Sequence, residues 1–281
     1  MKVKNEMVIV LLLMIIFAGL IVLINLPELS TDKDEEKNLT ENIFDNGLKL
    51  YFRFDKQPEN NKFVHDFSGN ENNGIMYGNA EWNKAGGIFN DGAFEFDGMD
   101  DKIIVSDSDE LSPSTYGGNF TVCFFIRFNN KNFIGEGSEK DYLNYLGKGN
   151  DRQGNEWLFR QYNSSNSEGR ENRLSFYIFN KEGGLGAGSY FQDDIKENEW
   201  IFVAGILNGT HIKIYKNGEL RSVNPISEYG IKMENTKANF NIGTYNSENF
   251  FNGSIDELRI YGRALNDLEV TELYNFYQSK K

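Results

Sequence analysis

The chain of 281 residues contains few of the residues that build disulfide frameworks, zinc sites or catalytic triads. Its single cysteine, Cys123, excludes a disulfide within the chain, so stability has to come from a buried core. The two histidines, His65 and His211, form no metal-binding or triad pattern with this cysteine. Cys123 lies in the apolar run NFTVCFFIRF, which is typical of a strand. We therefore expect a small buried thiol rather than a nucleophile.

Positive charge is also in short supply. The chain has 29 Lys and Arg residues against 42 Asp and Glu residues, which gives a formal net charge of −13. A strongly acidic protein repels phosphate backbones, so no nucleic acid is expected among its partners. The acidity is compatible with calcium sites and equally with simple solubility.

One long apolar run lies near the N-terminus. Residues 7–26 are almost all apolar, and about twenty helical residues span the core of a bilayer. Lys2 and Lys4 precede the run and a mainly acidic segment follows it, which predicts a cytoplasmic segment 1–6 and a transmembrane anchor 7–26. A cleaved signal peptide is the alternative, although its apolar region is usually shorter, about 7–15 residues.

Residues 27–46 are polar, charged and aperiodic, which predicts a flexible tether. The expected location is therefore the cell membrane, crossed once, with the C-terminal part outside the cytoplasm.

Beyond the tether, hydrophobicity alternates with a period of two. In LKLYFRFD, for example, Leu48, Leu50, Phe52 and Phe54 fall on one face, and such alternation predicts strands with one buried face. Turn clusters rich in Gly, Asn and Asp separate these runs, and no βαβ alternation occurs. We predict an all-β fold, either a sandwich or a barrel.

A single helix is expected at the C-terminus. Asn266 and Glu269 have the spacing of a capping box. An apolar stripe follows at helical spacing, formed by Val270, Leu273, Tyr274 and Tyr277. The stripe should pack on the sandwich.

Three segments resemble the laminin-G-like, concanavalin A-like lectin/glucanase jelly-roll family. The first comprises LYFRFD, HDFSGNENNGIMYG and GAFEFDGMDDKIIVS, and the second is WIFVAGILNGTHIKIYKNGEL. The third and most specific is FNIGTYNSENFFNGSIDELRIYGRALNDLEVTELY. The resemblance implies one jelly-roll sandwich of two antiparallel sheets at residues 47–278, used for binding or adhesion. It also implies carbohydrate or protein ligands and a structural calcium ion.

The calcium prediction rests on two distant segments. The loop 66–74 is dense in oxygen ligands of the kind that calcium prefers. The resemblance places Asp66 of this loop and the strand residue Asp256 at one calcium ion, and we expect Asn70 to complete the shell. The alternation changes parity between Ile255 and Leu258, which predicts a bulge near Asp256. The alternative is a turn at Asp66 and a surface position for Asp256.

The segment EFDGMD invites an enzymatic interpretation, because retaining glycosidases of this fold carry a Glu-x-Asp-x-x-Glu strand. Glu95 and Asp97 share a strand face, but the third carboxylate is Asp100 rather than Glu. A retaining mechanism needs two carboxyl groups about 5–5.5 Å apart. The same residues also match the ordinary strand end of the laminin-G-like family, so we expect no catalytic residue.

Aromatic residues of the middle region could stack on sugar rings. The candidates for ligand binding are Trp157, Tyr162, Tyr177 and Tyr190, with core packing as the alternative role. We therefore expect a membrane-anchored surface recognition module that binds carbohydrate or a surface protein and is not an enzyme. The alternatives are a carbohydrate-active enzyme of the retaining type and a purely structural envelope protein.

Overall fold

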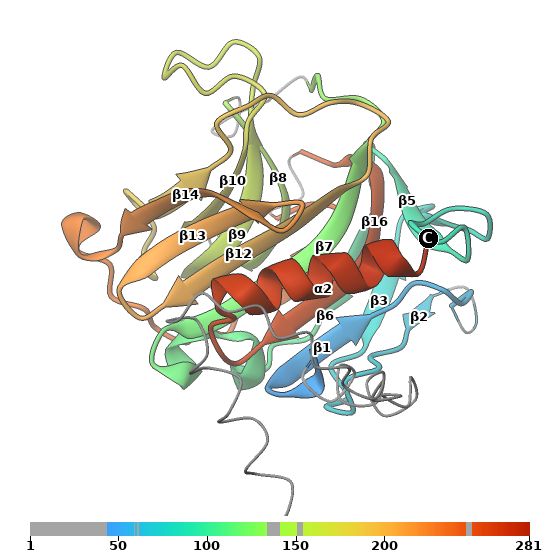
Figure 1. Ribbon diagram of the computed structural model, residues 1–281, viewed down its shortest axis with the longest axis horizontal. Helices are drawn as coiled ribbons and strands as arrows, with labels where there is room; N and C mark the ends of the chain where they lie inside the picture. Colours follow the sequence, from blue (N-terminus) through green and yellow to red (C-terminus); the bar gives the residue numbers. More distant parts are fainter. Residues whose placement is uncertain (1–43, 59, 61, 134–140, 151–153, 246–248) are drawn as a thin grey trace, which may run out of the picture. The chain divides into compact units, whose positions relative to one another are not determined.

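The computed structural model describes residues 44–58, 60, 62–133, 141–150, 154–245 and 249–281. These residues belong to one compact unit, residues 42–281, built from two eight-stranded sheets (Figure 1). All strand pairs within the two sheets are antiparallel. The predicted all-β, two-sheet sandwich is confirmed.

Sheet A has the order β14 (Glu219–Pro225), β13 (His211–Lys216), β12 (Ile201–Asn208), β7 (Asn119–Phe128), β16 (Asn252–Tyr261), β5 (Ala93–Asp97) and β4 (Glu81–Asn83), with β1 (Leu48–Phe52) paired to β16. Sheet B has the order β11 (Ala187–Tyr190), β10 (Leu174–Ile178), β9 (Gly154–Tyr162), β8 (Tyr142–Asn150), β15 (Phe240–Ile242), β6 (Lys102–Val105), β3 (Gly74–Tyr77) and β2 (Phe63–Val64). Short 3-10 turns lie at Asp109–Leu111, Pro113–Tyr116 and Ser227–Tyr229.

The main core lies between the two sheets, where inward side chains of both meet. In β7, Phe120, Phe124 and Phe128 are fully buried in this core. Burying one such ring stabilises the fold by about 1.5–3 kcal/mol. The other face of the strand is also covered, so Cys123 is buried and its pKa is raised to about 12 by desolvation. The thiol is therefore inert, as the sequence predicts.

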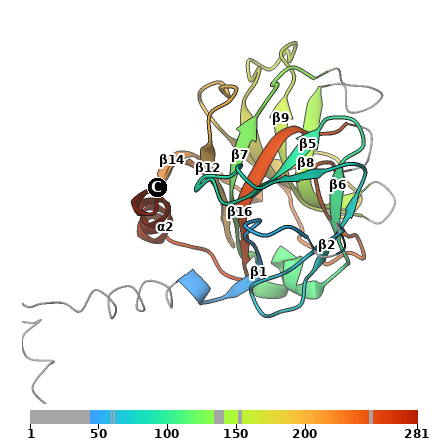
Figure 2. The same ribbon diagram turned by 90° about the vertical axis from the view of Figure 1, so that its right-hand side faces the viewer.

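Helix α2 (Asp267–Ser279) covers the outer face of sheet A (Figures 1 and 2). Its capping box is formed by Asn266 and Glu269, each accepting from the other's backbone N–H. The predicted stripe faces the sheet, with Val270, Leu273 and Tyr277 buried against β7 and β12. The predicted C-terminal helix and its cap are confirmed.

The predicted bulge in β16 is also present. The register of β16 against β7 shifts between Asp256 and Arg259, and Glu257 adopts a left-handed backbone with φ of 52°. The extra residue lets Ile255 and Leu258 both face the main core despite their odd spacing.

The predicted cytoplasmic segment 1–6, the anchor 7–26 and nearly all of the tether 27–46 lie outside the described residues. Within the described ranges, no helix is long and apolar enough to cross a bilayer.

Candidate functional site

The outer face of sheet B carries an aromatic cluster of its own. Strand β9 alternates strictly, so Trp157 and Phe159 point into the main core while Leu158, Arg160 and Tyr162 point outward. Neighbouring strands and the loop after β9 add further rings and a second arginine to the outward set. We call this the tyrosine–arginine face and define it as Tyr142, Arg160, Tyr162, Arg170, Tyr177 and Tyr190.

Arg160 is clamped between two rings of this face. Its guanidinium carbon lies 3.8 Å from the centroid of the Tyr142 ring and 4.0 Å from that of the Tyr177 ring. Stacking on both rings fixes the plane of the guanidinium and leaves its N–H edge to donate hydrogen bonds. The Nε atom is buried and has no hydrogen-bond partner among the described residues. Arg160 itself is half-buried, so part of the side chain reaches the surface.

The second arginine ties the cluster together from the loop after β9. Arg170 donates to the hydroxyl oxygens of Tyr162 and Tyr177 at 3.0 and 3.2 Å, and the two hydroxyls are 2.7 Å apart. Its guanidinium also lies 4.4 Å from the Tyr190 ring centroid and pairs with Glu168 at 3.1 Å. The Arg170 guanidinium thus has hydrogen-bond and ion-pair partners within the protein, whereas the Arg160 Nε has none among the described residues.

The electrostatics keep the rings neutral and the second arginine charged. Burial raises the pKa of Tyr177, and burial likewise raises the pKa of Tyr142. Burial alone would lower the pKa of Arg170, but its hydrogen bond to Tyr162 and the neighbouring tyrosines raise the pKa overall. At neutral pH Tyr142 and Tyr177 are therefore uncharged, and Arg170 carries a positive charge.

Gly188 makes room for one of the two clamping rings. It pairs with Tyr177 across β10 and β11, and a Cβ atom built on it would lie 2.4 Å from the Tyr177 ring. Since real Cβ atoms do not approach so closely, any larger residue here has to displace the ring. The clamp on Arg160 thus depends on a glycine in the neighbouring strand.

The predicted ligand residues do not all lie on this face. Trp157 is fully buried in the main core and donates its Nε1–H to the Leu111 carbonyl at 3.0 Å, so its prediction as a ligand residue is wrong. Tyr162 and Tyr177 are on the face but almost completely covered, whereas Tyr190 is half-buried. Tyr162 and Tyr177 therefore support the site more than they form its exposed surface.

Sequence reasoning missed Tyr142, Arg160 and Arg170. The signal for Arg160 was present, because it shares strand parity with Tyr162 in EWLFRQY. The same parity rule places Trp157, five residues before Tyr162, on the opposite face. Arg170 lies in a loop, where no periodic pattern assigns a direction.

The residues predicted to bind calcium have separate hydrogen-bonding roles. The Asp66 carboxylate accepts from the backbone N–H groups of Tyr51, Ser68 and Asn72 and from the Ser68 hydroxyl, all at 2.8–2.9 Å. Four donors fill the lone-pair sites of one carboxylate. Asn70 donates its side-chain amide to the Leu48 carbonyl and to the Ser68 hydroxyl.

The third predicted ligand holds a different loop. Asp256 is buried and accepts from the backbone N–H groups of Ile88 and Glu257 at 2.9 and 2.8 Å. Burial raises its pKa well above the ordinary 3.8, and the neighbouring Glu257 adds to the rise. These contacts do not fit one ion shared with Asp66, so calcium stays an untested prediction.

The described residues contain one other grouping of carboxylates. Asp97, Asp100 and Asp101 have oxygen atoms within 4.8 Å of one another in the turn after β5. Asp101 accepts from the backbone N–H groups of Asn79 and Asp97, which gives it a role in shaping that turn. The segment 96–101, which has the pattern Phe-Asp-Gly-x-x-Asp, is thus explained by the structure of this turn.

Glu95 shows no sign of a paired catalytic carboxylate. It accepts from the Asn83 amide at 2.9 Å and from Arg127 at 3.3 Å on the outer face of sheet A. Asp97 accepts instead from the backbone of Met99 inside its own turn. The two carboxylates therefore serve separate local contacts.

Comparison with protein families identifies this fold. Residues 97–271 match the model of the concanavalin A-like lectin/glucanases superfamily, a laminin-G type domain. The chain therefore belongs to this superfamily. No protein with a curated description matches the chain in sequence.

Two of the similar solved structures are binding domains of toxins. The binding domain of botulinum neurotoxin DC in complex with SialylT aligns with a TM-score of 0.62 at 20% identity, covering 83% of this chain and 52% of that one. The binding domain of Paraclostridial mosquitocidal protein 1 aligns at 0.58 and 21%, covering 83% and 53%. This chain thus spans about half the length of those toxin domains.

A third structure matches over its whole length. Domain 4 of AbnA, a GH43 extracellular arabinanase from Geobacillus stearothermophilus, in complex with arabinotriose, aligns at 0.58 and 19% identity, covering 81% of this chain and 98% of that one. At such identities the likeness shows the fold alone.

Proposed function

We propose that the protein is a recognition module that binds glycans carrying an acidic group at the tyrosine–arginine face. The observation that carries the proposal is Arg160, held face-on between Tyr142 and Tyr177 with a buried Nε that has no hydrogen-bond partner among the described residues. A guanidinium fixed in this way matches a carboxylate in bidentate geometry.

The rings supply the other half of the chemistry. Sugar rings have apolar faces, and tyrosines offer broad apolar area with a polar tip. Tyr142 and Tyr190 are half-buried and frame the Arg160–Arg170 region, so a sugar ring could contact them while its carboxylate meets Arg160. One similar toxin binding domain is in complex with SialylT and one similar arabinanase domain is in complex with arabinotriose, and both support carbohydrate as the ligand class.

The alternative of a retaining glycosidase has less support. Such an enzyme needs a carboxylate pair about 5–5.5 Å apart, free to reach the substrate. Glu95 is instead engaged by Asn83 and Arg127, and Asp97 by its own turn. We infer binding without hydrolysis, by a domain displayed outside the cell on the predicted anchor 7–26.

A matched pair of probes tests the proposal. Sialyllactose and lactose differ by one acidic sugar, and the full-length protein in detergent should bind the first at least about tenfold more tightly, which corresponds to about 1.4 kcal/mol. Arg160→Gln should remove that preference, whereas Arg221→Gln, a half-buried arginine of sheet A paired with Asp193, should keep it. Equal binding of both sugars, or an unchanged preference in Arg160→Gln, would contradict the proposal.

A further inference from the structure

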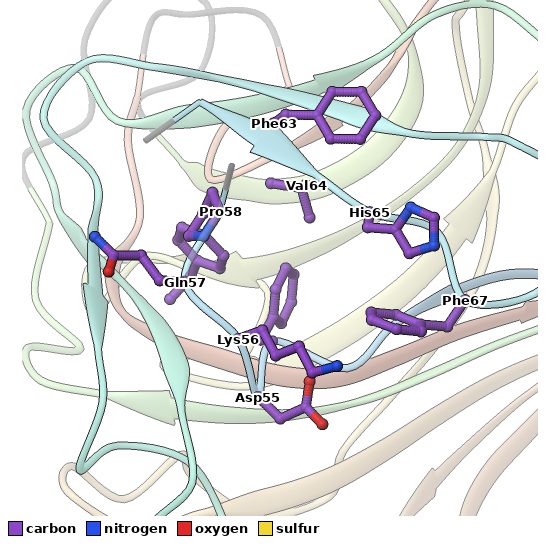
Figure 3. Close-up of a pocket in the computed structure, with 10 residues that line it drawn as sticks. Asp55, Lys56, Gln57, Pro58, Phe63, Val64, His65 and Phe67 are labelled. Atoms are coloured by element: carbon purple, nitrogen blue, oxygen red, sulfur yellow. The ribbon is translucent and has the colours of Figure 1, made fainter. Parts of the chain in front are cut away.

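A cavity of about 310 Å³ lies at the opposite edge of sheet B from the tyrosine–arginine face (Figure 3). Its lining comes from the segment that follows β1 and from the segment around β2. Figure 3 shows the rings of His65 and Phe67 on one side of the view, with Gln57 and Pro58 on the other. The volume is within the range of small-molecule sites, about 300–1,000 Å³.

The floor of the cavity includes a strained residue. Phe54 has a left-handed backbone with φ of 57°, which is an outlier for a bulky side chain. Two contacts hold it there: its carbonyl accepts from the Trp82 indole at 2.7 Å, and its buried ring packs edge-on against Phe94 at 4.9 Å. Strain that the surrounding structure enforces is concentrated at ligand sites. Here it sets the direction of the next residue, Asp55.

Asp55 offers one unsatisfied oxygen. Its Oδ2 pairs with Arg53 at 2.8 Å, while its Oδ1 is buried and has no hydrogen-bond partner in the described part of the chain. The side chain is only 13% exposed. Asp55 lines the cavity, and a buried carboxylate oxygen without a donor is costly, so an O–H or N–H group that reached Oδ1 would gain a strong hydrogen bond.

The charges around the cavity favour a neutral guest. Arg53 and Lys56 both approach the Phe67 ring, at 5.4 and 5.8 Å from its centroid. These two cations flank the Asp55 carboxylate and disfavour a positively charged ligand there. Since Asp55 itself disfavours an anion, neutral hydroxyl and amide groups are the remaining donors of suitable chemistry.

Aromatic side chains on one side of the cavity supply a surface for the apolar side of such a ligand. Phe67 is 37% exposed, His65 is exposed, and their rings meet edge to face at 4.7 Å. Phe63 extends this surface and is half-buried. We propose that this cavity is a second binding site, which takes one neutral sugar ring with a hydroxyl group on Asp55 Oδ1 and its apolar face on Phe67. The proposal is independent of the tyrosine–arginine face.

The two histidines provide a direct readout. His65 lines the cavity, and His211 is in β13 of the other sheet. In the full-length protein in detergent, neutral monosaccharides such as glucose, galactose, arabinose and N-acetylglucosamine are titrated while the imidazole NMR signals are followed. At least one sugar should move the His65 signals saturably and leave those of His211 in place.

Variants then assign the contact. Asp55→Ala should weaken the binding of that sugar at least about tenfold, the loss expected for one hydrogen bond to a charged group. Asp91→Ala is the matched control, because Asp91 is close enough to Asp55 to interact electrostatically but does not line the cavity. Phe67→Leu should also weaken binding, which guards against a folding defect in the Asp55 variant. Arg160→Gln should have no effect on this binding, so the proposal for the cavity and the proposal for the acidic-glycan site can be contradicted independently.

Three outcomes would overturn the inference. The first is the absence of a saturable His65 shift with any of the four sugars. The second is equal sugar affinity in wild type and Asp55→Ala. The third is a His65 shift produced by methylammonium or acetate but by no neutral sugar, which would assign the cavity to a charged ligand.

Discussion

Tyr277 ties helix α2 to buried charges in β16. Its hydroxyl donates to Glu257 at 2.8 Å and accepts from the Arg259 Nε at 2.8 Å, and all three side chains are buried. Tyr51 donates to the same Glu257 carboxylate from β1. Breaking a buried charged network is costly because a charge is left without its partner.

We therefore predict that Tyr277→Phe lowers the free energy of unfolding by about 1–3 kcal/mol. Tyr274→Phe, on the same helix and only partly buried, is the control and should change it by less than about 0.5 kcal/mol. Denaturant unfolding of both variants measures the difference. Equal stability of the two would show that the network contributes little.

Gly188 provides a second test at the scale of one residue. Gly188→Ala should displace the Tyr177 ring, loosen the clamp on Arg160 and weaken sialyllactose binding by about tenfold. In a Tyr177→Ala background the same change should have little effect, because the clash is gone. A double-mutant cycle on binding measures this coupling, and additive effects would contradict it.

At the scale of elements, Asp256 joins β16 to the loop that precedes β5. Burial raises the pKa of its carboxyl above the 3.8 of an ordinary aspartate, so the folded state holds the proton more tightly than the unfolded chain does. The stability that this proton contributes is present at low pH and is lost as pH rises through the folded pKa.

Asn at position 256 resembles the protonated carboxyl and cannot ionise. From about pH 4 upward, until the raised folded pKa is passed, the stability of Asp256→Asn relative to wild type should therefore rise with pH. Thermal or denaturant unfolding across this range measures the trend. A relative stability that stays constant or falls with pH would mean that Asp256 does not titrate as its burial indicates.

The calcium prediction is also tested at this scale. Because Asp66 and Asp256 are satisfied by separate protein donors, we expect equal melting temperatures with calcium and with chelator. A fall of several degrees in chelator, erased by Asp256→Ala, is what a calcium-stabilised domain of this size would show. That result would support the shared site predicted from the sequence.

The strands, the helix with its cap and the bulge in β16 follow from local patterns. Period-two alternation also determines which residues share a face, so the separation of Trp157 from Tyr162 was available from parity alone. The pairing of Tyr177 with Gly188 and the placement of Asp55 and Phe67 around one cavity depend on strand register and on the paths of loops, which local patterns do not determine. Which carboxylates have a hydrogen-bond or ion-pair partner depends on three-dimensional contacts between side chains. A single sequence does not reveal those contacts.

At the scale of the whole molecule, the N-terminal segment decides where the domain acts. Full-length protein should remain in the membrane fraction through alkaline carbonate washing, because residues 7–26 are long and apolar enough for a span. External protease should reach the β domain on intact cells. Mature protein that begins near residue 27 would instead identify a cleaved signal peptide.

The central claim is that the tyrosine–arginine face contacts the ligand. Amide hydrogen exchange of the full-length protein, with and without saturating sialyllactose, tests it most directly. We predict slower exchange in β8, β9 and β10 and in the loop that carries Arg170, with no change in sheet A beneath α2. Bound sialyllactose that leaves β8–β10 unchanged and protects another surface would contradict the account.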